Sequence, residues 1–163
     1  MTMVFDTLRV STVTDELDES EIHHIKGLFD VHEFQPGDVI TQPGDNRPDS
    51  LYILAQGNIE VKASADGRDS EDTLHVLKQG DLAGMITFVG GDSSQISAKL
   101  YAAGNTKIIS LEQRKVENLA YSKPMIALKI MRGVARSMHG IVRRGNSQTM
   151  ELTNYIHGIN GRY

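Results

Sequence analysis

The sequence predicts a mainly β domain, an antiparallel jelly-roll β-barrel with flanking helices that is followed by a long C-terminal helix. Two observations support this fold class. Between residues 31 and 111, short apolar runs are interrupted by Gly, Pro, Asn and Asp turn signals, which leaves room for strands but not for long helices. On both sides of this region the apolar residues recur with a helical period. A jelly roll accommodates many short strands while limiting their exposed edges.

The individual elements follow from these patterns in order. Apolar residues between positions 15 and 29 have helical spacing, and the early acids suit the positive end of a helix dipole. Strands are predicted from the apolar runs at 38–41, 50–54, 58–62, 73–77, 96–101 and 107–111. A short helix is expected at 115–121, and Pro124 suits the first turn of a helix that continues to about residue 157. That helix would be roughly 50 Å long, which exceeds the width of a small barrel.

Composition fits one soluble domain with an appendage. The 163 residues are 39% hydrophobic, which is enough for a packed core, and we divide the chain into a domain over 1–145 and a tail or helix extension over 146–163. The sequence lacks the apolar run of a membrane span and the pattern of a signal peptide, so we expect no membrane association and a cytoplasmic location. The absence of cysteine excludes disulfides, thiolate zinc sites and cysteine nucleophiles.

Charge is divided unevenly along the chain. Residues 1–117 hold twice as many acidic as basic side chains, whereas residues 118–163 hold 7 Lys and Arg against Glu151 alone. The basic end would attract an acidic partner, or it would pair with the acidic body of its own chain. The predicted basic surface consists of Lys129, Arg132, Arg136, Arg143 and Arg144.

Five different segments, taken in their order along the chain, carry a family resemblance. They are Phe34-Gln-Pro-Gly-Asp-Val-Ile, Gly44-Asp, Ser50-Leu-Tyr-Ile-Leu-Ala-Gln-Gly-Asn-Ile-Glu-Val, Gln79-Gly-Asp-Leu-Ala-Gly and Ser97-Ala-Lys-Leu-Tyr-Ala. Together they resemble the cyclic nucleotide-binding domain family over about residues 15–145. The resemblance implies the jelly-roll fold and a site in which a short helix, a glutamate and an arginine hold a cyclic nucleotide.

The same resemblance places the family's glycine at Gly84, its glutamate at Met85 and its arginine at Ile96. Both charged contacts are therefore replaced by apolar side chains. Charge-assisted hydrogen bonds contribute roughly 1.5–3 kcal/mol each, so losing the phosphate contact should weaken binding about tenfold to more than a hundredfold. No Lys or Arg stands between Lys78 and Lys99, and Lys99 is three residues from Ile96, which places the two side chains on opposite faces of a strand.

The altered pocket remains a candidate site for a small-molecule effector. Its serines would suit a neutral or weakly anionic ligand, although the same residues also fit a polar loop. The predicted pocket consists of Gly84, Met85, Ile86, Ser94, Ile96, Ser97 and Ala98.

The long last helix resembles the helix that pairs subunits in the catabolite-activator branch of the family, which predicts a homodimer. The alternative is that its apolar stripe packs on the barrel of its own chain. Gly133, Ser137 and Gly140 form an adjacent small-residue face where another backbone could approach. The predicted stripe consists of Met131, Val134, Ala135, Met138, Ile141 and Val142.

No catalytic residue, metal site or cofactor is predicted. His75 is the one clear strand histidine, and the adjacent His23 and His24 point apart on a helix. The few residues after Arg144 do not suffice for a helix-turn-helix, so we expect no sequence-specific DNA binding.

These patterns favour a non-catalytic regulatory or adaptor module with weak or lost cAMP and cGMP binding. It would act through protein-protein contacts of its C-terminal helix, as a homodimer and with a protein partner. One alternative is a sensor that binds cAMP, cGMP or another small effector in the altered pocket. The other is a jelly-roll metalloenzyme, which would require metal ligands converging from the strands.

Overall fold

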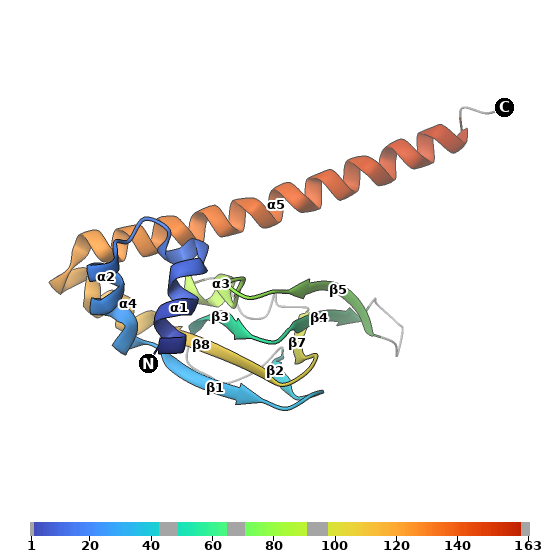
Figure 1. Cartoon of the computed structure of the whole chain (residues 1–163). Coiled ribbons are helices and arrows are strands. Elements are labelled where there is room, and N and C mark those ends of the chain that lie inside the picture. Colours follow the sequence, from blue (N-terminus) through green and yellow to red (C-terminus); the bar gives the residue numbers. More distant parts are fainter. Residues whose placement is uncertain (1, 43–48, 65–70, 91–97, 161–163) are drawn as a thin grey trace.

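The computed structural model describes residues 2–42, 49–64, 71–90 and 98–160, which form two four-stranded antiparallel sheets with helices against one of them (Figure 1). The helices are α1 (Thr2–Val10), η1 (Thr12–Thr14), α2 (Glu19–Ile25), η2 (Lys26–Leu28), α3 (Met85–Phe88), α4 (Gln113–Ser122) and α5 (Pro124–Asn160). The strands are β1 (Asp30–Phe34), β2 (Val39–Thr41), β3 (Ser50–Gln56), β4 (Ile59–Ser64), β5 (Glu71–Leu77), β6 (Leu82–Ala83), β7 (Ala98–Ala102) and β8 (Thr106–Glu112). The strand orders are β1-β8-β3-β6 and β2-β7-β4-β5, and the predicted fold class is confirmed.

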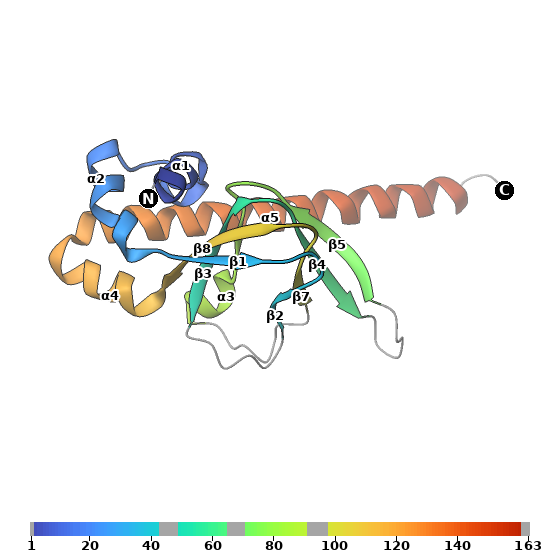
Figure 2. The same ribbon diagram turned by 60° about the horizontal axis from the view of Figure 1, so that its bottom comes forward.

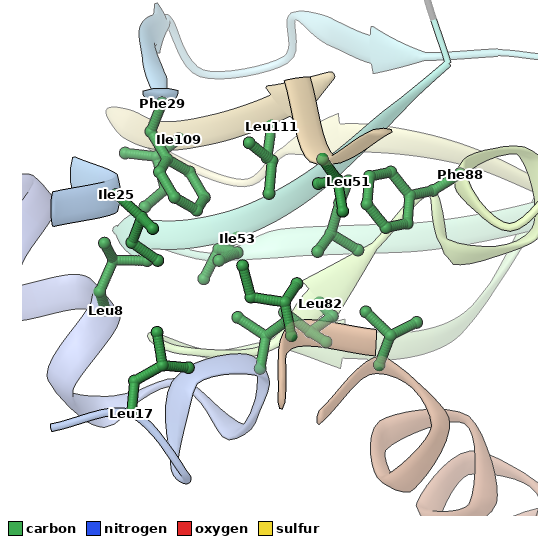
Figure 3. Packing of buried hydrophobic residues seen from close by; sticks show 14 of the residues in the cluster. Leu8, Leu17, Ile25, Phe29, Leu51, Ile53, Leu82, Phe88, Ile109 and Leu111 are labelled. Carbon is green, nitrogen blue, oxygen red and sulfur yellow. The ribbon is translucent and has the colours of Figure 1, made fainter. Parts of the chain in front are cut away.

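Strand β3 lies between the two core clusters, so both of its faces are buried. Successive side chains of a strand point to opposite faces. Leu51 and Ile53 pack in the cluster on the helix side, whereas Leu54 packs in the cluster between the two sheets. Figure 3 shows Leu51 and Ile53 in the helix-side cluster, with Ile109 and Leu111 of the neighbouring strand β8.

The N-terminal helices differ from the sequence prediction in extent. A helix over 15–29 was expected, but α2 starts only at Glu19, because Asp18 caps it. The Asp18 carboxylate accepts a hydrogen bond from the Glu21 amide at 2.8 Å, and the Glu21 carboxylate accepts one from the Asp18 amide at 3.0 Å. Helix α1 was not predicted at all, and it is anchored by buried Val4 and Leu8, which are one helical turn apart.

Helix α5 is held to the body along its first half. Its 37 residues correspond to a length of about 55 Å. Ile126, Ile130 and Val134 are buried on one side. Next to them, Gly133 faces η1, and a Cβ atom at this position would lie 2.5 Å from the backbone oxygen of Val13. The second half runs away from the helical end of the molecule without a break at residue 145 (Figure 2).

We predict that Gly133→Ala destabilises the fold. The new methyl group would collide with the backbone of η1, and overpacking of this kind costs about 1–3 kcal/mol. Gly140→Ala is the matched control on the same helix, because its Cβ would have only the end of the Arg144 side chain within 4 Å, at 3.9 Å. The control should leave the free energy of unfolding in urea unchanged or raise it by up to about 1 kcal/mol. Equal effects of both substitutions would contradict the close contact.

Candidate functional site

The turn from β6 into α3 packs tightly against β3. Gly84, the residue between the two elements, has φ 75°, a conformation that side-chain-bearing residues rarely adopt. A Cβ atom there would lie 2.6 Å from the backbone oxygen of Ser50 and 2.9 Å from the ring of Tyr52. Glycine is therefore required at this position both by the backbone conformation and by the available space.

Helix α3 is anchored by apolar side chains. Met85 is 9% exposed, and it belongs to the helix-side core cluster together with Phe88 and Leu51. Figure 3 shows the Phe88 ring beside Leu51. A carboxylate at position 85 would have to leave water for an apolar environment, which is costly for a charged group without a partner. The Met85 side chain therefore functions as a packing group in this structure.

Lys99, the cation nearest in sequence to position 96, lies on the outer face of its sheet. Leu100 and Ala102 pack between the two sheets, so Lys99 and Tyr101, which alternate with them, face outward. Lys99 Nζ lies 2.8 Å from a carboxylate oxygen of Glu71, and the Tyr101 hydroxyl donates a hydrogen bond to the same carboxylate at 2.8 Å. Lys99 is thus held outside the sandwich by an ion pair.

The same outer face carries a second lysine, in a cluster that was not predicted from the sequence. Lys62 lies 2.9 Å from the Glu60 carboxylate, and its ammonium group is 5.1 Å from the centre of the Tyr101 ring. A hydrogen bond from Lys99 lowers the pKa of Glu71, and the same bond raises the pKa of Lys99. Cross-strand pairing of β4 with β5 and β7 brings these residues together, so alternation along the strands and a predicted strand order could have revealed them.

The predicted pocket is only partly within the described residues. Gly84 and Met85 lie at the start of α3, and the backbone of Ile86 continues this helix. Ala98 is half-buried at the start of β7. Ser94, Ile96 and Ser97 lie outside the described residues, so the structure does not test whether the seven residues form one pocket.

Three members of the predicted basic surface pair with the N-terminal segment of the same chain. Lys129 Nζ contacts both carboxylate oxygens of Glu21, at 2.7 and 2.8 Å. Arg132 Nε donates a hydrogen bond to Glu16 at 2.9 Å, and Arg136 contacts Glu16 at 2.6 Å and also Asp15. Lys129, Arg132 and Arg136 are therefore used in ion pairs within the chain itself, as one of the two interpretations of the predicted basic surface expected.

The remaining two members are not paired in this way. Arg143 and Arg144 are exposed on the second half of α5, and neither has an ion pair within the part of the chain that the structure describes. They are the members of the predicted basic surface that stay available to another molecule.

The predicted apolar stripe of α5 is divided between two sides of the helix. Val134 is buried, and half-buried Met138 packs against the helix-side core, so these two residues contact their own chain. The other members are exposed, and they are Met131, Ala135, Ile141 and Val142. The predicted small-residue face is likewise used in part by the chain itself, since the backbone that approaches Gly133 is that of η1.

The rest of the described surface includes shallow pockets near the N-terminal helices, and no metal centre is found in the residues described. One pocket lies between α2 and the start of α5, and another lies between α1 and the turn from β3 to β4. Within the described ranges, no three His, Asp or Glu side chains are grouped closely enough to hold a metal ion. None of the helices described is long and apolar enough to cross a membrane.

Comparisons with known proteins agree with this architecture. Residues 31–122 match the cyclic nucleotide-binding domain family. No curated protein sequence matches the chain significantly. A similar solved structure is a cyclic nucleotide-binding domain from Methylobacillus flagellatus KT, with 14% identity over 92% of this chain and 82% of that chain, at a TM-score of 0.78.

Two other similar structures are parts of larger proteins. The catabolite activator protein of Thermus thermophilus is 22% identical over 88% of this chain and 63% of that chain, at a TM-score of 0.71. The regulatory subunit of a cAMP-independent protein kinase A from Trypanosoma brucei is 22% identical over 82% of this chain and 45% of that chain, at a TM-score of 0.66. This chain thus spans less than two thirds of either, and the likeness concerns the fold.

We predict that Glu16→Gln destabilises the protein at neutral pH but not in acid. The hydrogen bond from Arg132, joined by Arg136, outweighs partial burial and lowers the pKa of the Glu16 carboxyl. The ionised carboxylate therefore favours the folded state fully above the ordinary glutamate pKa of about 4.3, and this contribution is lost as the pH falls through the lowered folded-state value.

Urea unfolding at several pH values measures this effect. The wild type should exceed Glu16→Gln in stability at neutral pH, and the difference should shrink in acid and in high salt. Glu117→Gln is the matched control, because Glu117 is an exposed residue of α4 without an ion pair in the described ranges. A difference that stays constant across the pH range would show that the ion pairs do not stabilise this contact.

Proposed function

This chain belongs to the cyclic nucleotide-binding domain family, and we propose that it is a regulatory or adaptor module with weak or lost affinity for cAMP and cGMP. It acts without catalysis, through protein contacts of α5. The burial of Met85 is the observation that supports weak or lost affinity for cAMP and cGMP. The family resemblance assigns a ligand glutamate to this position, and here the position holds an apolar side chain packed in the core.

The electrostatics of the sequence support the same proposal. A cyclic phosphate is recognised best by a guanidinium group or another cation at short range. The resemblance assigns this role to position 96, which is Ile96, and the sequence has no Lys or Arg between Lys78 and Lys99. Lys99 is engaged by Glu71 on the outer face of the sheet. A relative described as the regulatory subunit of a cAMP-independent protein kinase A has the same fold, which fits a regulatory role without dependence on cAMP.

The exposed side of α5 supports pairing with a second copy. Leu128, Met131, Ala135 and Val142 are exposed and are spaced three, four and seven residues apart, as in the contact seam of a coiled coil. Met131 is 37% exposed and Val142 is 60% exposed, so much of this seam stays uncovered in the single chain. We therefore propose that two chains associate side by side along α5, and that the resulting dimer is the form that meets a protein partner.

We predict that cAMP does not stabilise the wild-type protein. A ligand raises the Tm only when its concentration exceeds its Kd for the folded state, so about 100 μM cAMP should leave the Tm unchanged. Ile96→Arg restores a cation and keeps Met85 in its core position. We expect cAMP to raise the Tm of this variant but not that of the uncharged control, Ile96→Gln.

Stabilisation of the wild type at micromolar cAMP would contradict the proposal. Loss of that stabilisation in Ser97→Ala would further identify the altered pocket as a working sensor site. Stabilisation by a different small molecule, also lost in Ser97→Ala, would favour the sensor of another effector.

We predict that Val142→Asp converts the dimer into a monomer. The substitution places a charge in the contact seam, where it would be buried without a partner. Light scattering after size-exclusion chromatography at micromolar concentration measures the mass. Ser147→Asp is the matched control, because it introduces the same charge on an exposed position of α5 outside the seam. A monomeric wild type, or a dimer that persists in Val142→Asp, would exclude pairing along α5.

A further inference from the structure

A pocket lies at the corner where α4 ends and α5 begins, facing α2. This corner pocket is lined by Ser20, Glu21 and His24 of α2 and by residues 122–126. Its volume of about 390 Å³ is in the range of ligand pockets. Figures 1 and 2 show the corner at the end of the molecule opposite to the C-terminal end of α5. The corner pocket is therefore open to a partner that approaches this end.

Large apolar side chains are exposed at the same corner. Met125, which lines the pocket, is 57% exposed, and Tyr121, which directly precedes the lining residues in the sequence, is 91% exposed. The residues of α2 that line the pocket are polar, so α2 supplies no apolar cover for Met125. Tyr and Met are enriched in protein interfaces relative to the rest of the surface. Their exposure here favours an apolar group of another molecule as the occupant of the pocket.

The charge that is left at the corner pocket is positive, because the acidic residues of α2 are already paired. Glu19 contacts Arg9 at 3.9 Å. Glu21 contacts Lys129 at 2.7 Å. Lys123 is exposed, and its ammonium group has no ion pair in the part of the chain that the structure describes. An acidic side chain of a partner would therefore meet an unpaired cation next to an apolar surface.

We propose that the corner pocket is the docking site of a partner protein that presents an apolar side chain next to an acidic one. The apolar side chain packs on Met125, and the carboxylate pairs with Lys123. Apolar contact bounded by complementary charge is a typical composition of a protein interface. This inference rests on the adaptor role proposed above and names the surface at which the partner binds.

The corner pocket and the dimer seam use different sides of α5. Met125 stands four and seven residues before Lys129 and Arg132, which pair with the N-terminal segment, so it lies on that side of the helix. The seam through Met131 and Val142 lies on another side. A dimer paired along the seam would therefore keep both of its corner pockets accessible.

Peptide display on the full-length protein tests this assignment. Short random peptides on phage are selected against the immobilised wild type, and the Kd of each selected peptide is measured by fluorescence anisotropy. We expect the selected peptides to share an apolar residue next to Asp or Glu. Met125→Ser should raise their Kd about tenfold. Lys123→Gln should raise it about two- to fivefold, because an exposed ion pair contributes less than a buried apolar side chain.

Matched controls make the same chemical changes away from the pocket. Met150→Ser replaces another exposed methionine of α5, and Lys78→Gln replaces another exposed lysine, between β5 and β6. Neither control should change the Kd. Because Met125 and Lys123 are exposed, both pocket variants should keep the Tm of the wild type. A selection that enriches no peptide, or peptides whose Kd does not respond to Met125→Ser or Lys123→Gln, would overturn the inference.

The monomeric variant Val142→Asp separates this inference from the proposed function. It should bind the selected peptides with the Kd of the wild type, because Val142 lies outside the corner pocket. Binding that requires Val142 but not Met125 would place the partner on the seam, which overturns this inference and leaves the adaptor role standing. If the peptides require Met125 while micromolar cAMP stabilises the wild type, the pocket assignment stands and the loss of cAMP affinity fails.

Two other occupants are distinguished by further measurements. Vesicles of phosphatidylserine and phosphatidylcholine should not bind the protein, and vesicle binding that Met125→Ser abolishes would overturn the inference in favour of a membrane surface. Light scattering should show no assembly beyond the dimer. Larger assemblies that Met125→Ser abolishes would show that a further copy of this chain occupies the pocket, which also overturns the inference.

Discussion

The contact between α5 and the N-terminal segment fixes the geometry of the whole molecule. At Gly133 the backbones of α5 and η1 approach so closely that no side chain fits between them. Four ion pairs, made by Lys129, Arg132 and Arg136, surround this point. Because the first half of α5 is held here, the direction of the second half is determined by the rigidity of the helix. The exposed seam and the exposed arginines result from this arrangement.

A second constraint lies at the start of α3, which packs tightly against β3 and the helix-side core. Gly84 allows the chain to turn against β3. It stands at the position to which the resemblance assigns the family's glycine. The following residue, Met85, contributes its side chain to the core that connects sheet and helices. The element that the resemblance assigns to ligand binding is thus joined to the hydrophobic core.

The sequence predicted the features that depend on local pattern. Turn signals and apolar runs indicated β2, β3, β4, β5, β7 and β8 but not β1 or β6, and Pro124 marked the start of α5, where the structure also places it. Features that depend on tertiary contact were less accessible. Helix α1 is short, and its buried Val4 and Leu8 become recognisable only once a surface is present to cover them. The partner of Gly133 could not be inferred, because a glycine in a helix signals close approach without showing which backbone approaches.

The charged residues likewise combine a feature that is visible in the sequence with one that depends on tertiary contacts. The sequence revealed the uneven distribution and left two interpretations open, and only the structure shows that Lys129, Arg132 and Arg136 pair within the chain. Position 99 was different, because strand alternation alone indicated that Lys99 does not face the interior. Its observed ion pair with Glu71 on the outer face agrees with that argument.

The bare second half of α5 has a thermodynamic consequence. Gly145, Thr149 and Thr153 lower the helix propensity of this half. Most helical stability in proteins comes from the packing of an apolar face, and here residues 141–150 are exposed to solvent. Pairing along α5, as proposed above, would supply such packing to the second half. The helicity of this half would then depend on protein concentration, as expected for any structure that association stabilises.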